Sequence, residues 1–124
     1  MMARAARLLV VDDHEIVRFG VVKLLAKDPN FVVCGEASNG VEAIKKVEEL
    51  APDAVILDLS MPGMSGFEVA EELHHIAPRS RIIFFSMHEI PTIARLAGAD
   101  AFVSKTDALR DLVPTLSRVL SGAQ

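Results

Sequence analysis

Polar side chains that could do chemistry together follow several short apolar runs of this 124-residue sequence. They comprise three carboxylates, one hydroxyl and one ammonium: Asp12, Asp13, Asp58, Ser86 and Lys105. If the runs are neighbouring parallel strands, the residues at their carboxyl ends meet at one edge of a sheet. Three carboxylates crowded together repel one another, so they must share protons or bind a cation. Oxygen ligands that leave space for water and phosphate favour Mg²⁺.

These residue types at one sheet edge predict the chemistry of phosphoryl transfer. Mg²⁺ offsets the carboxylate charge, which lets an anionic phosphoryl donor approach Asp58 as the nucleophile. Lys105 supplies a second positive charge for the phosphate oxygens, and Ser86 supplies a hydroxyl donor. The sequence therefore predicts a site that works by positioning and charge neutralisation.

Each of these residues also has an ordinary structural interpretation. Asp12 or Asp13 could cap a helix that begins near His14, because aspartate is common at that position. The other three could be loop or solvated surface groups. Their joint placement at matching strand ends favours a common site over five independent roles.

Five apolar runs have the length and composition of strands that are covered on both faces of a parallel sheet. They are Leu8–Val11, Phe31–Gly35, Ala54–Leu57, Arg81–Phe85 and Ala101–Val103. Four segments between or after them have an apolar stripe at helical spacing. The residues predicted to face inward are Ile16, Val17, Val21, Leu24 and Leu25; Val41, Ile44, Val47 and Leu50; Phe67, Val69, Ala70, Leu73 and Ile76; and Leu109, Leu112, Val113 and Leu116.

Strands that alternate with helices predict βαβ units with helices on both faces of the sheet. We therefore predict one α/β domain over residues 1–124, a flavodoxin-like (βα)5 three-layer sandwich. Its five parallel strands are expected in the order 2-1-3-4-5.

The composition excludes several classes of protein. With 51% hydrophobic and 24% charged residues, the chain can bury a sizeable core and is not expected to be disordered. The net charge of −4 argues against sequence-independent binding to nucleic acid. No apolar run approaches the roughly 18 residues of a membrane span, and the N-terminus is too weakly apolar for a signal peptide. We expect a cytoplasmic protein without a membrane partner.

The single cysteine and three of the histidines are predicted to have no special chemistry. Cys34 lies in an apolar run, so it is expected to be a buried small hydrophobe. His14, His74 and His75 suggest no metal site. Neighbouring His74 and His75 point about 100° apart on a helix, so they cannot share a ligand face.

Four motifs make the chain resemble a known family. They are Val10-Val11-Asp12-Asp13-His14, Ile56-Leu57-Asp58-Leu59-Ser60-Met61-Pro62-Gly63-Met64-Ser65-Gly66, Ser86-Met87-His88 and Gly98-Ala99-Asp100-Ala101-Phe102-Val103-Ser104-Lys105. This set resembles the receiver domain of two-component response regulators. Within this family, the residues of the motifs are most similar to those of the NarL/FixJ subfamily.

The resemblance implies a role for each site residue. Asp58 would accept a phosphoryl group from a histidine of a sensor histidine kinase. Asp13, Asp58 and the backbone carbonyl of Ser60 would ligate Mg²⁺ directly, with Asp12 acting largely through water. Lys105 would pair with the acceptor and then with the phosphate. Ser86 would move inward to the phosphoryl group, and Phe102 would turn inward behind it.

The resemblance also implies an output. As the receiver of a transcription regulator, the chain would act on DNA only through a helix-turn-helix domain that is not in this chain. It would form a homodimer on phosphorylation. The alternative is a single-domain receiver that acts by protein contact or phosphate shuttling. In both cases it is a switch with self-phosphotransfer and autodephosphorylation, and not an enzyme.

The sequence departs from the family pattern in the region of the output face. Only 19 positions separate Ser86 from Lys105, about three fewer than in the family. The missing residues are expected within Thr92–Ala97. Since a helical turn takes about 3.6 residues, the fourth helix is then expected to be only about two turns long. Pro114 removes a hydrogen bond from the last helix. We expect altered or weakened signalling through this face.

Two residues beside the site are expected to tune it. We expect Ser60 and His88 to set the phosphoryl lifetime.

Two other classes with this fold fit the residues less well. A flavin binder needs a phosphate-cradling loop after the first strand, where Asp12 and Asp13 would repel phosphate. A phosphatase of the haloacid dehalogenase type needs a second acidic residue two positions after the nucleophile. Ser60 occupies that place.

Overall fold

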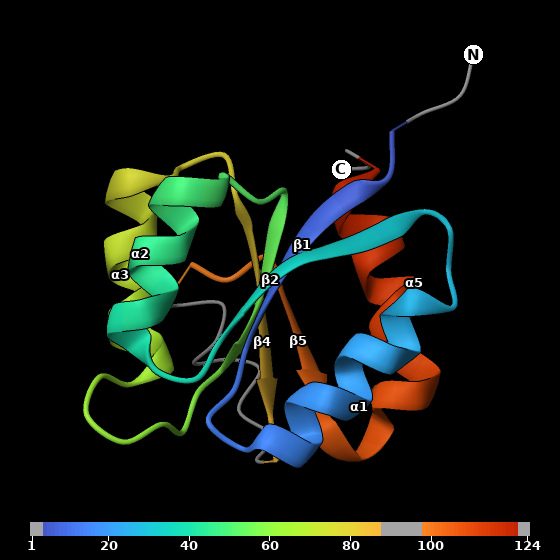
Figure 1. Cartoon of the computed structure of the whole chain (residues 1–124), viewed down its shortest axis with the longest axis horizontal. Coiled ribbons are helices and arrows are strands. Elements are labelled where there is room, and N and C mark those ends of the chain that lie inside the picture. Colours follow the sequence, from blue (N-terminus) through green and yellow to red (C-terminus); the bar gives the residue numbers. More distant parts are fainter. Residues whose placement is uncertain (1–3, 88–97, 122–124) are drawn as a thin grey trace.

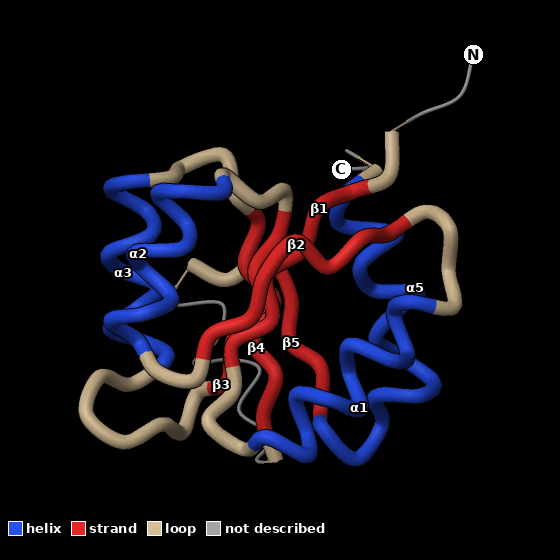
Figure 2. Tube along the Cα trace, viewed as in Figure 1, coloured by secondary structure: helices blue, strands red, loops and turns tan. Residues whose placement is uncertain are grey.

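The computed structural model describes residues 4–87 and 98–121 of the chain. Within them, five parallel strands form one sheet in the order β2-β1-β3-β4-β5 (Figure 2). The elements are β1 (Ala6–Val11), α1 (Glu15–Ala26), β2 (Phe31–Ala37), α2 (Gly40–Leu50), β3 (Ala54–Asp58), α3 (Gly66–Ile76), β4 (Arg81–Ser86), β5 (Ala101–Ser104), the short 3-10 helix η1 (Lys105–Asp107) and α5 (Ala108–Leu120).

The sheet is the middle layer of a three-layer sandwich. Figure 1 shows α1 and α5 on one face of the sheet and α2 and α3 on the other. Each face has its own buried cluster of apolar side chains, so the central strands are covered on both sides. The predicted fold and strand order are confirmed. This arrangement also explains the continuous apolar runs, because every residue of β3 is buried.

β2 lies at the edge of the sheet and differs from the other strands. The register with β1 shifts between Leu8, which pairs with Val33, and Leu9, which pairs with Gly35. Cys34 is therefore an extra residue, as in a β-bulge. It is only half-buried, and Val32 is 46% exposed. The predictions that this strand is covered on both faces and that Cys34 is buried are wrong, because most residues of this edge strand are half-buried or exposed.

Buried pairs one turn apart set the inward stripe of three helices. They are Val21 and Leu25 in α1, Ala43 and Val47 in α2, and Leu112 and Leu116 in α5. The helical repeat places the predicted stripe residues Ile16 and Val41 about 160° and 140° around the helix from the midpoints of these pairs. Both are exposed, at 85% and 73%, so their inward prediction is wrong.

Two further predicted stripe residues are exposed because they lie at helix ends. Leu109 is in phase with Leu112 but lies in the first turn of α5, directly after η1, and it is 86% exposed. Ile76 is the last residue of α3 and is 37% exposed.

Side-chain caps fix where α2 and α3 begin. Asn39 accepts a hydrogen bond from the Glu42 amide at 2.8 Å. Ser65 and Glu68 form a reciprocal capping box at the start of α3. These caps end the loops that run from the carboxyl edge of the sheet, so they help to hold those loops in place.

The structure describes the helix that contains Pro114 but not the predicted short fourth helix. The helix α5 continues through Pro114 without interruption. The predicted short helix near Thr92–Ala97 lies outside the described residues, and so does His88. None of the described helices is both long and apolar enough to cross a membrane.

Candidate functional site

The five polar residues singled out in the sequence lie at the carboxyl edge of the sheet. Asp12 and Asp13 follow β1, Asp58 ends β3, Ser86 ends β4 and Lys105 follows β5. β1 and β3 are neighbours, and β2 lies beyond β1, so the acids flank the point where the strand order reverses. Open parallel sheets bind ligands at this point. The structure brings Asp12, Asp13, Asp58 and Lys105 together, and it places Ser86 at the end of β4, the strand next to β3.

A buried lysine links two of the acids. The Nζ atom of Lys105 lies 2.8 Å from Asp12 Oδ2 and 3.3 Å from Asp58 Oδ1. Asp12 and Asp58 are each only 1% exposed, and the Lys105 side chain is 7% exposed. With Asp13 beside them, three carboxylates share one ammonium, which leaves an excess of two negative charges when all are ionised. Such an excess is costly in a buried site unless a further cation is bound.

Unpaired oxygen atoms show where a cation fits. Asp58 Oδ2 and Asp13 Oδ1 are buried and accept no hydrogen bond from the described residues. One ligand atom each from Asp12, Asp13, His14 and Asp58 lies within 4.8 Å of the others. The acidic cluster could therefore bind a metal ion, and its carboxylate oxygens suit a hard divalent ion. His14, which the sequence analysis did not assign to a metal site, lies within this group.

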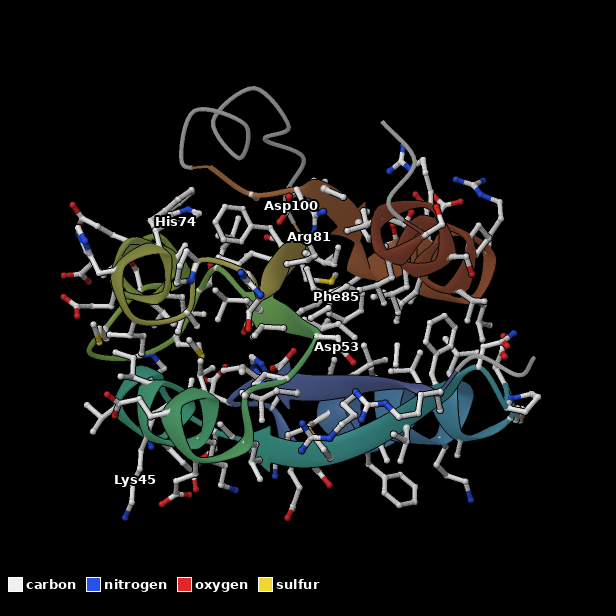
Figure 3. The ribbon with its side chains drawn as sticks, turned by 90° about the horizontal axis from the view of Figure 1, so that it is seen from above. Lys45, Asp53, His74, Arg81, Phe85 and Asp100 are labelled. Carbon is white, nitrogen blue, oxygen red and sulfur yellow. The ribbon has the colours of Figure 1, made fainter. Side chains whose placement is uncertain are left out.

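Acids at the opposite edge of the sheet are paired, in contrast to this cluster. Asp53 Oδ2 accepts the Arg7 amide at 2.7 Å. Asp100 accepts the Ile82 amide at 2.8 Å and pairs with Arg81 at 3.2 Å. Figure 3 labels Asp53, Arg81 and Asp100 at this amino-terminal edge. Only the acids at the carboxyl edge keep buried oxygens free, among the described residues.

The surroundings of Asp58 disfavour its charged form when no metal is bound. Burial is the largest cause and the nearby charge of Asp12 adds to it, so that the pKa of Asp58 is raised to about 6. The Lys105 ammonium and the Ser60 amide, which donates to Asp58 Oδ1 at 3.2 Å, act in the opposite direction. A bound cation would favour the ionised carboxylate.

The loop that carries Asp12 and Asp13 is held by hydrogen bonds at both of its ends. Asp12 Oδ1 accepts the His14 amide at 2.9 Å. Arg18 on α1 donates from Nη1 to the Asp12 carbonyl at 2.7 Å, and from Nε to Glu36 at 2.9 Å. The N-cap of α1 is His14, without a side-chain bond, so neither aspartate is the helix cap itself. Arg18 was not among the candidate site residues of the sequence analysis.

A glycine lets α3 pack directly against the backbone of Asp58. The Gly66 amide donates to the Leu59 carbonyl at 3.1 Å. A Cβ atom at Gly66 would overlap the Asp58 carbonyl oxygen and come within 2.8 Å of Leu59 Cα. The glycine is therefore required by a close backbone approach next to the predicted acceptor.

The remaining predicted site residues have defined positions, while their roles stay predictions. The side chain of Ser60 is on the exposed loop after β3. Ser86 is buried at the end of β4. Phe102 is half-buried and packs against the apolar cluster on the α2 and α3 face, paired in register with Phe84. The predicted inward movement of Ser86 and Phe102 concerns a second state of the protein.

Sheet order and acidic edge together define a flavodoxin-like α/β domain with a candidate cation site at its switch point. The chain belongs to the response regulator receiver domain family, whose profile matches residues 8–117. The sequence resemblance to receiver domains is thereby confirmed.

Several relatives carry names from this family. The nitrate/nitrite response regulator protein NarL of Escherichia coli K12 is 39% identical over 120 residues, which cover 94% of this chain and 56% of that protein. The response regulator GacA of Pseudomonas aeruginosa is 34% identical over 94% of this chain and 56% of its own length. The chain thus spans about half the length of the curated relatives that it matches.

Solved structures agree with the fold. A two-component response regulator of the LuxR family from Aurantimonas sp. SI85-9A1 superposes with a TM-score of 0.89 at 35% identity, over 95% of this chain and 86% of that one. The signal receiver domain of the putative response regulator NarL from Mycobacterium tuberculosis gives a TM-score of 0.89 at 32% identity, over 97% and 99%.

Proposed function

We propose that this chain accepts a phosphoryl group on Asp58 from a phosphorylated histidine of a sensor kinase, in a magnesium-dependent reaction. The observation that carries this proposal is the state of the Asp58 carboxylate. One of its oxygens is held by Lys105 at 3.3 Å, while the other is buried without a hydrogen-bond partner among the described residues. Such an oxygen is available both to a cation and to an electrophile.

The residues of the site divide the work of phosphoryl transfer. Asp13, Asp58 and the Ser60 backbone carbonyl would hold Mg²⁺, with Asp12 acting through water, and the ion would neutralise charge on the phosphoryl oxygens. A carboxylate oxygen of Asp58 forms the new bond to phosphorus as the bond to the donor imidazole breaks. The ring nitrogen keeps the electron pair of the broken bond, and the imidazole leaves as a neutral ring because its other nitrogen already carries a proton. Lys105 then follows the negative charge from the carboxylate to the phosphoryl group.

The proposed output lies outside the described chain. Relatives of the chain include the transcriptional activator protein ExaE of Pseudomonas putida and a DNA-binding response regulator of the LuxR family from Staphylococcus aureus. We infer a cytoplasmic switch, and not an enzyme, that forms a homodimer on phosphorylation. It controls transcription through a helix-turn-helix domain beyond these residues. The second candidate is a single-domain receiver that acts by protein contact or phosphate shuttling.

Treatment with acetyl phosphate and Mg²⁺ tests the acceptor directly. Intact-protein mass spectrometry should show one added phosphoryl group per chain, and none in Asp58→Asn or when EDTA removes the metal. Asp111→Asn is a matched control, because Asp111 lies on α5 and pairs with Arg110 on the surface. Labelling that persists in Asp58→Asn but is lost in Asp111→Asn would contradict the proposal.

A further inference from the structure

The imidazole of His14 lies against the acidic cluster. Its Nδ1 atom is 3.4 Å from Asp12 Oδ1 and 3.3 Å from Asp13 Oδ1. The side chain is 66% exposed, so it stands at the mouth of the cluster, next to the buried acids. Although His14 is the N-cap of α1, its side chain makes no capping hydrogen bond. The ring is therefore not occupied by a structural bond to the helix.

These spacings suit an octahedral metal ion. With metal–ligand bonds near 2.1 Å, neighbouring ligand atoms of an octahedron lie about 3.0 Å apart and opposite ones about 4.2 Å apart. The distances from Nδ1 to the two carboxylates are close to the neighbouring value. The cluster of Asp12, Asp13, His14 and Asp58, with its ligand atoms within 4.8 Å, needs only a small contraction around an ion.

A second observation points to an ion at this place. Asp58 is 1% exposed, and its Oδ2 atom has no hydrogen-bond partner among the described residues. A buried carboxylate oxygen costs free energy if it stays unpaired. An ion bound by the cluster would give Asp58 Oδ2 the partner that it lacks among the described residues.

The nitrogen changes which ions the site prefers. Magnesium binds oxygen ligands almost exclusively, whereas imidazole suits zinc, copper, iron and nickel. A site built only from carboxylates already binds the later first-row transition metal ions more tightly than the earlier ones. An added imidazole ligand raises the affinity for the ions that prefer nitrogen, and it does not raise the affinity for Mg²⁺.

We propose that His14 is a nitrogen ligand of the acidic cluster, so that the site binds nitrogen-preferring divalent ions such as Ni²⁺ as well as Mg²⁺. The inference rests on the proposed function, because it assumes that the acids at the ends of β1 and β3 form a cation site. Its consequence is regulatory: such an ion competes with magnesium for Asp13 and Asp58, the residues that must hold magnesium for phosphoryl transfer.

Calorimetric titration of the whole chain with Ni²⁺ and with Mg²⁺ separates the two kinds of binding. His14→Ala should weaken Ni²⁺ binding by about tenfold or more and Mg²⁺ binding by less than about twofold, because only nickel uses the imidazole. The substitution removes no capping bond, so the fold should persist. His75→Ala, on the exposed surface of α3, is the matched control and should leave both affinities unchanged.

The outcomes distinguish this inference from the proposed function. If His14→Ala leaves the ratio of the Ni²⁺ and Mg²⁺ affinities unchanged, His14 is not a ligand and the inference is overturned. Mg²⁺ binding that Asp13→Asn abolishes would still support the proposed function in that case. If Mg²⁺ fails to bind the unaltered chain, or binds Asp13→Asn equally well, the cation site of the proposed function fails, and the inference fails with it.

Discussion

The pKa of the Asp58 carboxylate depends on burial and on neighbouring charges that act in opposite directions. Burial and Asp12 raise its pKa, and Lys105 lowers it. Lys105 alone does not balance the charge of the three acids, so the cluster could bind a divalent ion. The paired acids at the other sheet edge, such as Asp100 with Arg81, show what the same residue type looks like in a purely structural role.

The raised pKa of Asp58 predicts a specific pH dependence of stability. Below the ordinary pKa of 3.8, both the folded and the unfolded chain hold the proton, and the residue has no net effect. As the pH rises from there to about 6, the unfolded chain releases the proton while the folded chain keeps it, so stability falls. Above this window the full destabilisation remains, on the order of 1–3 kcal/mol.

Urea unfolding of the metal-free protein checks this prediction. Asp58→Asn cannot ionise, so its free energy of unfolding should exceed that of the unaltered chain near pH 7.5, and the difference should shrink toward pH 4. Far-UV circular dichroism is the suitable signal, because the chain has no tryptophan and no tyrosine. Parallel pH profiles for the two proteins would show that Asp58 has no raised pKa.

At the scale of the elements, the start of α3 and the acceptor loop act as one packed unit. The Ser65 and Glu68 capping box fixes the first turn of α3, and Gly66 brings that turn onto the Asp58 backbone. A displacement of Asp58 toward or away from α3 must therefore move this turn as well. The position of the acceptor depends on a helix start that is eight residues away in the sequence.

Two glycine-to-alanine substitutions test this packing with opposite expected signs. Gly66→Ala places a methyl group against backbone atoms that cannot rotate away, so we expect a loss of about 1–3 kcal/mol of stability. Gly20→Ala lies within α1 with nothing within 4 Å of the new methyl group. Because alanine favours a helix more than glycine does, we expect a gain of about 0.5–1 kcal/mol.

Thermal unfolding of both variants provides the measurement. The pair is informative because helix propensity favours alanine at both sites, and only the close approach to Asp58 opposes it at Gly66. A stabilised Gly66→Ala would show that α3 does not pack tightly on the acceptor loop.

The sequence predicted the central strands and the acidic edge well, for a clear physical reason. Residues such as those of β3 are covered on both faces, so their apolar character is continuous and their strand ends are marked by polar residues. Ile16 and Val41 were misplaced because they lie on the side of their helices opposite the buried pairs. Cys34 was misplaced because exposure at a sheet edge depends on the neighbouring elements. The contacts of Arg18 and His14 with the acidic loop depend on the path of that loop, which spacing alone does not define.

On the scale of the whole molecule, the two edges of the sheet differ in their chemistry. The carboxyl edge carries the acidic cluster. The amino edge carries paired acids and several arginines, and a cavity of about 310 Å³ lies there between Arg4, Arg79 and Arg81. With a net charge of −4, the chain as a whole has no excess of positive charge for binding a phosphate backbone.

We therefore expect this 124-residue chain alone not to bind duplex DNA. Fluorescence anisotropy with a labelled duplex should show no salt-dependent binding at micromolar protein concentration, before or after treatment with acetyl phosphate. Binding that weakens steeply with added salt would mean that these residues contact DNA themselves. In that case the proposed assignment of DNA contact to a domain beyond them would be wrong.

The irregular pairing of β2 with β1 has a consequence for how copies of the chain behave toward one another. An exposed outer strand offers free backbone groups to any other chain that could add a strand to it. The extra residue at Cys34 interrupts the regular spacing of those groups and increases the local twist. A second copy therefore finds no long straight edge to extend at β2, so ordered strand addition at this edge is disfavoured.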